Sequence, residues 1–339
     1  MQYPEILPEH RKNEWTHADW FHDKLLDNVK CYFHRESSMI GMHLHGFYEL
    51  NILVEGHGRH YIQRTEESNA NAGHAQSFDA TPGSVFVLPP NVRHGYFAMP
   101  YLNIFHALIH CAFIERYARE LEALPGYATL FEIEPGLRGE RAQPLFLHLE
   151  ADALSRLLPE MQAMVSMESS GYPGIDTMKN GRLLWLIGAL CQQVESKRDT
   201  HATANEDAYS LFIVGSMEYL RRHFPERLSI ETLAKQANMS RSTYLRHFHQ
   251  VCGKTPAQYQ TECRIQCAKA LLRCTERSIS DIAHECGFYD SSHFIRVFEQ
   301  RTGASPRLYR TDGRDHCARP DFHLSSASPF PVATSHASN

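Results

Sequence analysis

Apolar positions recur with a helical period in two short stretches of the last third of the chain. They are spaced by three or four residues, which places them on one face of a helix. They are Ile230, Leu233, Ala234 and Ala237 in the first stretch and Ile279, Ile282 and Ala283 in the second. A short turn follows each stretch, and then Ser240 or Asp290, residue types that begin helices by accepting hydrogen bonds from backbone N–H groups. Both stretches therefore predict a helix, a turn and a second helix.

The second helix of each pair has a predicted buried face and a defined end. The buried faces are Tyr244, Leu245 and Phe248 in the first unit and Phe294, Val297 and Phe298 in the second. Each unit closes on Gly-x-x-Pro, where Gly ends a helix readily and Pro begins the next one. Residues 259–273 predict one continuous helix between the units. Helix-turn-helix geometry also occurs in plain helical bundles, but two tandem units that close alike favour a protein that reads DNA.

Polar residues that lie off the apolar faces, near the start of each second helix, are the candidate DNA-reading residues. They are Arg241, Ser242, Thr243 and Arg246 in the first unit and Ser291, Ser292, Ile295 and Arg296 in the second. Arg is the usual partner of guanine, although a surface ion pair is an alternative role for each arginine.

Charge is divided unequally along the chain. Residues 221–314 contain 16 Lys and Arg against 9 Asp and Glu, a net charge of +7, whereas the whole chain carries −5. The remainder therefore carries −12. This partition places the affinity for phosphate in the last third.

The last third resembles the DNA-binding domain of the AraC/XylS family of transcription regulators. The residues that carry the resemblance are Ala234, Met239, Ser240, Arg246, Phe248, Gly253, Pro256, Tyr259, Arg264, Ala268, Leu271, Leu272, Ile279, Ile282, Ala283, Gly287, Phe288, Phe294, Phe298, Gly303 and Pro306. The first unit departs from the family pattern at His247 and Cys252. In the family, the positions of Arg246 and Arg296 reach bases or phosphates. The resemblance implies a transcription activator whose partners are promoter DNA and RNA polymerase.

Short apolar runs separated by Gly, Pro and Asn predict β structure between residues 30 and 110. Two motifs stand out in this region, H-x-H-x3-E-x6-G from His43 and G-x5-P-x-N-x2-H from Gly83. Because alternate residues of a strand share a face, His43, His45 and Glu49 point the same way. The two motifs resemble those of the cupin β-barrel, with Asn91 where Gly is usual. In cupins the matching residues, which include His94, converge on a metal.

Three roles remain open for this cluster. The set His43, His45, Glu49 and His94 suits a divalent transition metal, but the same groups can frame an effector pocket or form structural hydrogen bonds. Tyr48, Arg59 and Tyr61 are candidates to add hydrogen-bond donors to an effector pocket. A sugar or a related metabolite suits such a pocket.

Helical periodicity follows at 114–124 and 149–168, and residues 183–194 are apolar nearly all round. In the rhamnose-responsive members that this chain resembles, the helices after the barrel form the dimer contact, so we expect a homodimer. Residues 195–207 are polar and lack periodicity, which predicts a flexible linker. The tail, 315–339, has no core-forming pattern and is predicted to be disordered.

The predicted fold class is α+β: a cupin-like β-barrel with flanking helices, then an all-α domain with two helix-turn-helix motifs. The segments are 1–29 as an N-terminal extension, 30–113 as the effector domain, 114–194 as the dimerisation region, 195–207 as the linker, 208–314 as the DNA-binding domain and 315–339 as the tail. The chain has no apolar run long enough for a bilayer and no targeting pattern, so we expect a cytoplasmic protein. Its nine cysteines, Cys263 and Cys267 among them, are expected to be reduced and not to bind zinc.

We therefore predict a DNA-binding activator, and not an enzyme, controlled by a small molecule in the barrel and needing no cofactor. The alternative is a metal-dependent cupin enzyme or a metal sensor fused to a DNA-binding domain, with a divalent metal in the barrel.

Overall fold

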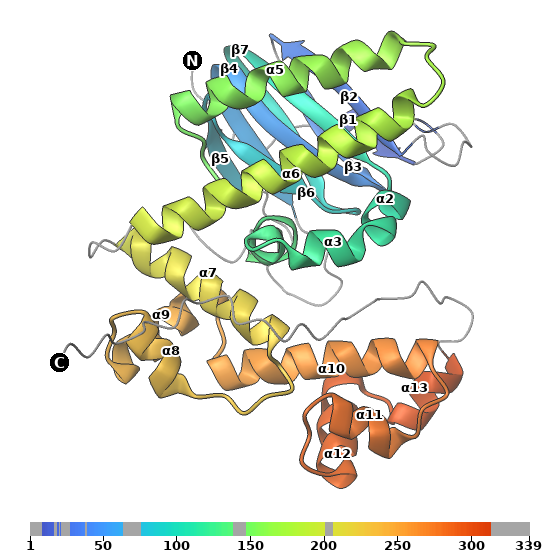
Figure 1. The fold of residues 1–339 in the computed structure, drawn as a ribbon, viewed down its shortest axis with the longest axis vertical. Helices are drawn as coiled ribbons and strands as arrows, with labels where there is room; N and C mark the ends of the chain where they lie inside the picture. The colour runs from blue at the N-terminus through green and yellow to red at the C-terminus, as the bar shows by residue number, and fades with distance from the viewer. Residues whose placement is uncertain are drawn as a thin grey trace, which may run out of the picture. The chain divides into compact units, whose positions relative to one another are not determined.

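The computed structural model describes residues 9–16, 19, 21, 28–37, 39–63, 76–137, 147–200 and 206–312. The chain divides into two compact units, Met1–Leu211 and Phe212–Asn339. The first unit combines a β-sheet with helices and the second is helical throughout its described part (Figure 1), so the predicted α+β class is confirmed. No helix among these residues has both the length and the apolar character to cross a membrane.

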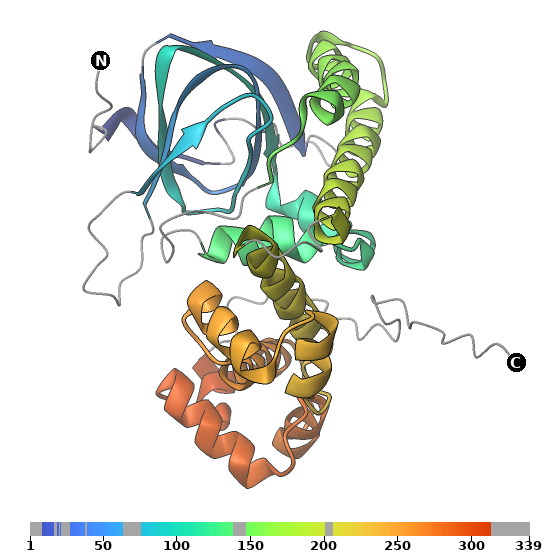
Figure 2. The same cartoon turned by 90° about the vertical axis from the view of Figure 1, so that its left-hand side faces the viewer.

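The sheet of the first unit curls into a barrel (Figure 2). Its described strands are β1 (Glu9–Trp15), β2 (Val29–Glu36), β3 (Met39–His45), β4 (Tyr48–Gln63), β5 (Gln76–Ala80), β6 (Val85–Leu88) and β7 (Arg93–Ile109). The main strand order is β1-β3-β7-β4-β5, with β2 on β7 and β6 on β4. The pairings are antiparallel, except that β1 runs parallel to β3. The long strands β4 and β7 pair with each other and with most of the others, so they carry the barrel.

One strand was not predicted. Residues 1–29 were expected to form an extension, but β1 lies within them and adds to the edge of β3. The segment EHRKNEW has no alternation of apolar and polar residues, so the sequence pattern gave no signal for a strand. Pairing with an exposed edge requires only backbone groups, which every residue type except proline supplies.

The helices that follow the barrel are α2 (Cys111–Arg116), α3 (Ala118–Ala123), η1 (Thr129–Ile133), α4 (Glu134–Leu137), α5 (Ala151–Ser166), η2 (Met167–Ser169) and α6 (Ile175–Thr200). The predicted helix at 114–124 is broken at Tyr117, which closes α2 with a non-helical backbone. The apolar stretch 183–194 lies inside α6, as its all-round apolar character predicted.

Helices α5 and α6, here called the helical pair, pack on β2. Val29 and Cys31 of that strand are buried in a core cluster with residues of both helices. The buried ammonium of Lys179 donates to the carbonyl of Val29 (3.1 Å) and to the Glu168 carboxylate (3.3 Å). Glu168 in turn accepts the backbone N–H of Cys31 (2.9 Å). The strand is thus fastened to the helical pair by both apolar and charged contacts.

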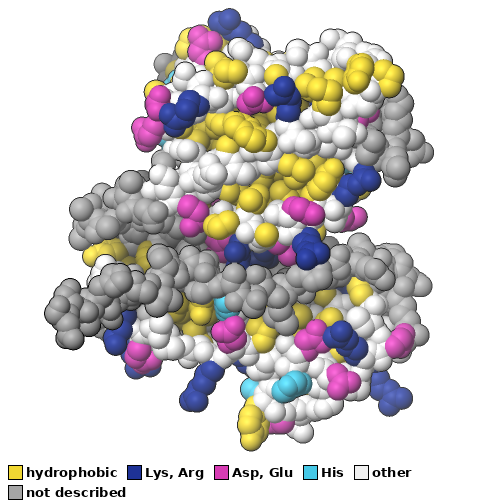
Figure 3. Space-filling view, viewed as in Figure 1, with side chains coloured by type: hydrophobic (Ala, Val, Ile, Leu, Met, Phe, Trp, Pro, Cys, Tyr) yellow, Lys and Arg dark blue, Asp and Glu magenta, His cyan; other side chains and the backbone are white. Residues whose placement is uncertain are grey.

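The opposite face of the helical pair carries exposed apolar side chains, which are visible along it in Figure 3. Met178 and Trp185 of α6 are about half exposed. Gly181 and Gly188 lie between and beyond them, and a Cβ added at either glycine would meet nothing within 4 Å. This face is therefore apolar and open among the described residues.

The predicted linker was wrong at both of its ends. Helix α6 continues to Thr200, and α7 (Glu206–Arg222) begins before the expected boundary; residues 201–205 lie outside the described part. Glu, Lys and Arg favour helix even without an apolar stripe, so a polar segment can extend a helix that its buried part has already formed. The predicted disordered tail, 315–339, also lies outside the described residues.

The second unit contains α8 (Ile230–Gln236), α9 (Arg241–Cys252), α10 (Pro256–Cys274), α11 (Ile279–Glu285), α12 (Ser291–Thr302) and α13 (Pro306–Asp312). The predicted caps are in place: the Ser240 hydroxyl accepts the backbone N–H of Thr243, and the Asp290 carboxylate accepts that of His293. Left-handed Gly253 and Gly303 end α9 and α12. The two helix-turn-helix units and the connecting helix therefore lie where the sequence predicted them.

Candidate functional site

A cavity of about 300 Å³ lies in the barrel, at the lower end of the range of roughly 300–1,000 Å³ that is usual for small-molecule sites. Strands β2, β3, β4 and β7 supply its walls. The lining residues are Tyr32, His34, Glu36, Met39, Ile40, His43, His45, Phe47, Glu49, His94, Tyr96, His106 and Leu108. Four of the predicted residues, His43, His45, Glu49 and His94, are thus brought together.

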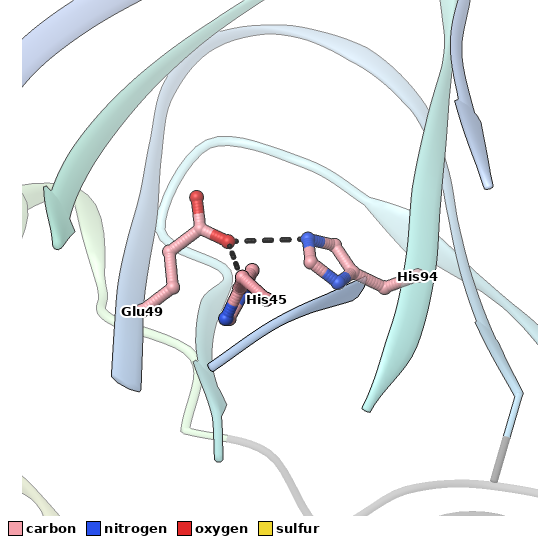
Figure 4. A group of neighbouring side chains, drawn as sticks. All are labelled: His45, Glu49 and His94. Carbon is pink, nitrogen blue, oxygen red and sulfur yellow. Dashed lines mark hydrogen bonds and ion pairs between the residues drawn. The ribbon is translucent and has the colours of Figure 1, made fainter. Parts of the chain in front are cut away.

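Glu49 is the centre of the polar groups in this cavity. Its Oε2 lies 3.0 Å from Nε2 of His45 and 3.1 Å from Nε2 of His94 (Figure 4). Its Oε1 lies 2.6 Å from Nδ1 of His106. All four side chains are buried, so one carboxylate lies against three imidazole rings at a place shielded from water.

The ring orientation of three histidines is set by backbone carbonyl groups. Nδ1 of His43 donates to Gly41 (2.9 Å), that of His45 to Phe47 (2.7 Å) and that of His94 to Val92 (3.3 Å). A carbonyl oxygen only accepts, so each Nδ1 carries a proton. In a neutral ring Nε2 then carries a lone pair, and two such nitrogens are directed at the same oxygen of Glu49.

Burial sets the charge of these groups. Burial lowers the pKa of His43 to about 3, and it also lowers the pKa of His94. Burial alone raises the pKa of the Glu49 carboxyl, but the close contacts of this group with the imidazoles of His106, His45 and His94 outweigh burial and hold that pKa well below its ordinary value. The carboxylate is therefore ionised beside a neutral His94.

This arrangement fits a divalent cation. A lone pair of neutral His94 facing an ionised oxygen is unfavourable unless a proton or a cation lies between them. His45, Glu49 and His94 place one ligand atom each within 4.8 Å of the others, and imidazole with carboxylate suits Zn²⁺ and similar metals. The bonds from Nδ1 to backbone carbonyls are those that orient metal-binding histidines in proteins.

A hydrogen bond joins the two sequence motifs at this point. The backbone N–H of Asn91 donates to the carbonyl of His45 (2.8 Å). Asn91 adopts the left-handed conformation (φ 65°), which Asn tolerates better than most residues other than Gly. The departure from the cupin pattern at this position therefore keeps the backbone geometry that Gly would permit.

Three predicted effector residues lie outside the cavity. Tyr48 occupies the face of β4 opposite to Glu49 and its ring packs near Phe131. Arg59 pairs with Asp79 on the neighbouring strand β5. Tyr61 is buried in a small cluster with Met42. None of the three is among the residues that line the cavity.

Irregularities in β4 explain the positions of Arg59 and Tyr61. The register of β4 against β7 shifts between Leu53 and Glu55 and again between Gly56 and Gly58. Such shifts change which alternate residues face the interior. After them it is His60 that stacks on the cavity residue Tyr96 (ring centroids 4.2 Å apart), so its neighbours on either side point away.

The sequence reasoning missed five polar lining residues: Tyr32, His34, Glu36, Tyr96 and His106. His106 matters most, because it contacts Glu49 and its ring stacks on Tyr32 (4.8 Å). Its Nε2 is buried without a hydrogen-bond partner in the described structure. The signal was a lone histidine within the apolar run 102–108, and alternation along 32–36 would have identified the three residues of β2.

The second unit presents its candidate residues on the outward faces of α9 and α12. Arg241, Ser242, Arg246, Ser292 and Arg296 are exposed. The ion pair of Arg241 with Glu231 of α8 (3.2 Å) joins two exposed side chains and leaves the guanidinium accessible.

The other three candidates take part in the fold. The hydroxyl of Thr243 lies 2.8 Å from that of Ser240, Ser291 donates to Ser280 (3.2 Å), and Ile295 packs against the apolar core of the second unit. All three are half-buried. His293, which was not predicted, is exposed at the start of α12 beside Ser292.

Two segments of the chain match known protein families. Residues 31–212 match the family described as an AraC-like ligand binding domain, and this segment is more than half of the chain. Residues 233–312 match the family described as a helix-turn-helix domain.

Curated relatives share parts of both segments. The HTH-type transcriptional activator RhaS of Citrobacter koseri is 27% identical over 252 residues, which is 74% of this chain and 81% of that protein. RhaS of Enterobacter sp. is 44% identical over 78 residues, which is 23% of this chain but only 28% of that protein.

Solved structures match the same parts of the chain. The DNA-binding domain of AdpA in complex with a target DNA is 31% identical and covers 30% of this chain and 93% of its own, with a TM-score of 0.29. ToxT from Vibrio cholerae is 15% identical and covers 84% of this chain and 98% of its own, with a TM-score of 0.31. At these TM-scores the structural likeness adds nothing to the family matches.

Proposed function

The chain belongs to the AraC family of helix-turn-helix transcriptional regulators, and from that premise we propose that a small hydroxyl-bearing molecule in the barrel cavity controls its action at promoters. The DNA-binding function and the presence of a ligand-binding domain follow from the family. The identity of the effector, the dimer, the contact with RNA polymerase and activation as the sign of control are proposals. The enzyme considered from the sequence is set aside, because this family consists of transcription regulators.

The polar character of the cavity supports a neutral effector rich in hydroxyl groups. Its described lining contains the carboxylates Glu36 and Glu49 but no Lys or Arg, so an anionic effector would find no permanent positive charge. Hydroxyl groups can donate to these carboxylates and to the buried Nε2 of His106. Tyr32 and Phe47 supply aromatic walls. A sugar or polyol meets these requirements better than a sugar acid or an aromatic acid. The observation that carries the proposal is the buried, unpartnered Nε2 of His106.

Strand β2 contacts both the cavity and the helical pair. Tyr32, His34 and Glu36 face the cavity, whereas Val29 and Cys31 of the same strand pack on the helices. Because β2 packs on the helical pair, an effector that favours one position of β2 also favours one position of the helical pair. Binding of the effector would then shift the population of the protein between two arrangements.

We place the homodimer contact on the outward face of α6. Met178, Gly181, Trp185 and Gly188 follow one another at spacings of three and four residues, which forms a seam along a helix. A second copy of the same face would bury the exposed Trp185 ring against an open glycine position. Trp185→Asp is expected to convert the dimer into a monomer in sedimentation experiments, with Gln192→Asp on the same face but beyond the apolar residues as the control.

A thermal-shift screen of the full chain tests the effector proposal, because a ligand that binds only the folded state raises the melting temperature. The panel contains neutral sugars and polyols, the matching sugar acids, aromatic acids and divalent metals. We expect a neutral sugar or polyol to stabilise the protein and to change its affinity for DNA. Glu36→Gln should weaken this effect and Glu55→Gln, outside the cavity, should not. Stabilisation by acids alone, or a hit that leaves DNA affinity unchanged, would refute the proposal.

A metal-sensing regulator is the second candidate, supported by the two Nε2 atoms directed at one oxygen of Glu49. His45, Glu49 and His94, with His43 beside them, would hold the ion, which would supply positive charge to the cavity. Elemental analysis and a melting temperature that falls on chelation would support it. DNA affinity that responds to the chelator but to no organic compound would decide for the metal as the effector.

A further inference from the structure

The turns of the two helix-turn-helix units differ by one residue. Each turn is closed by the same backbone hydrogen bond, from Met239 N–H to the carbonyl of Ala234 in the first unit and from Phe288 N–H to that of Ala283 in the second, both 2.9 Å. In the first unit the cap of the recognition helix follows this bond directly. In the second unit, Tyr289 stands between the bond and the cap.

Tyr289, the extra residue, is not packed into the core of its own helix-turn-helix unit. The side chain of Tyr289 is 96% exposed, the highest value among the exposed large hydrophobic residues of the described chain. The first unit closes its turn without a counterpart. A tyrosine in such a position offers a partner both an apolar ring and a hydroxyl group that can donate a hydrogen bond.

The residues on both sides hold Tyr289 in place. Gly287 packs so tightly on Pro225 that an added Cβ would lie 2.4 Å from the carbonyl oxygen. Phe288 is buried, with its ring near the guanidinium of Arg264 (5.8 Å). On the other side, Asp290 accepts the N–H of His293 (2.7 Å) and so begins α12. The tyrosine therefore lies on a fixed turn at the N-terminal end of the second recognition helix.

We propose that Tyr289 contacts the DNA backbone at the wall of the major groove, with its hydroxyl donating to a phosphate and its ring packing on a deoxyribose. Recognition helices enter the groove with their N-terminal residues towards the bases. Ser292 and Arg296 on the outward face of α12 are the candidate base readers, and Tyr289 precedes Ser292 by three residues. A side chain at this place meets the phosphate backbone beside the bases that those residues read.

RNA polymerase is the competing partner for an exposed aromatic residue. The position of Tyr289 favours DNA, because the turn and the cap place it at the end of the helix that enters the groove. A contact with polymerase would leave DNA affinity unchanged and reduce only transcription. The inference rests on the DNA binding of the family and is independent of the proposed effector.

The test measures the affinity of the full chain for two duplexes at several salt concentrations. One duplex is selected by the wild-type protein from a random pool, and the other is a scrambled sequence of equal length. We expect Tyr289→Phe to lose about three- to tenfold in affinity for both duplexes, as for one lost hydrogen bond, and Tyr289→Ala to lose more. Because the hydroxyl is neutral, the salt dependence should keep its slope, unlike the loss of a Lys or Arg contact.

Three outcomes would overturn the proposal. Equal affinity of Tyr289→Ala and wild type excludes a DNA contact, and a loss of transcription in that case assigns the tyrosine to polymerase. A loss confined to the selected duplex makes it a base reader. A similar loss in Tyr172→Ala, an exposed tyrosine of the N-terminal unit Met1–Leu211, would show that the effect is not local. Melting temperatures equal to wild type confirm that each variant is folded.

Discussion

The barrel and the helix-turn-helix unit arrange their binding groups in opposite ways. In the barrel, Glu49 and the histidines around it are buried and hold one another in place. In the second unit, Arg246 and Arg296 are exposed on helices whose other faces carry the apolar core. In the barrel, the residues that bind the effector should therefore also stabilise the fold. In the second unit, the residues that bind DNA should differ from those that stabilise the fold. Substitutions can test this division.

The largest effect is expected from Glu49→Ala. The change leaves three buried imidazoles without the carboxylate that all three face, and breaking a buried ionic group in this way costs about 3–5 kcal/mol of unfolding free energy. All three tryptophans of the chain lie in the first unit, so their fluorescence during urea unfolding reports on that unit. Glu55→Ala on the exposed part of the same strand should cost below about 1 kcal/mol. Equal stability of the two variants would contradict the division.

A large effect in the second unit should come from the backbone and not from a binding residue. Gly287 and Gly253 both have positive φ, which costs other residues about 1–2 kcal/mol. Only at Gly287 would an added Cβ also meet a neighbour, the carbonyl of Pro225. We expect Gly253→Ala to cost about 1–2 kcal/mol and Gly287→Ala about 3 kcal/mol or more. Hydrogen exchange measures both losses, at the α9 amides for Gly253→Ala and at the α11 and α12 amides for Gly287→Ala. Equal losses would show that the contact with Pro225 relaxes freely.

A smaller effect, confined to binding, is expected for Arg296→Ala. Its guanidinium is exposed at the outward face of α12, so removing it should leave the melting temperature unchanged. Affinity for the selected duplex should fall by about 1–3 kcal/mol, with relaxed base preference, if the contact is to guanine. Gln300→Ala, exposed later on the same helix, is the control. A variant that binds as tightly as wild type would remove Arg296 from the reading set, and one that unfolds would break the division.

The second unit was also easier to predict from the sequence than the barrel site. In the second unit the signals were local: Ser240 and Asp290 as caps, and Gly253 and Gly303 as helix ends, each fix the structure within a few residues. The exposed face of a recognition helix follows from its apolar stripe, so five of the eight candidate DNA residues were placed on the accessible surface. Tyr289 was not singled out, because it lies in the turn before α12, where no apolar stripe shows which side chains are exposed.

In the barrel the site depends on pairing between distant strands. His43, His45 and Glu49 were found because they lie close together in the sequence, although a short turn separates His43 and His45 at the end of β3 from Glu49 at the start of β4. His106 reaches Glu49 only because β7 pairs with β4 across 57 residues of sequence, which one-dimensional alternation does not reveal. The register shifts in β4 are equally invisible in the sequence, and they turned the predicted Arg59 away from the cavity.

The smallest effect is therefore expected for Arg59→Ala. The guanidinium pairs with Asp79 and donates to Ser77 at the surface, so its loss should cost at most about 1 kcal/mol of stability. Binding of the compound found in the thermal-shift screen, measured by calorimetry, should be unchanged. His106→Asn is the opposite case, because His106 lines the cavity and its buried Nε2 is the acceptor proposed for the effector. If Arg59→Ala abolished binding and His106→Asn did not, the effector would lie on the β5 side of the sheet. The barrel would then bind its ligand outside, as the DNA-binding unit does, and the difference between the two regions would disappear.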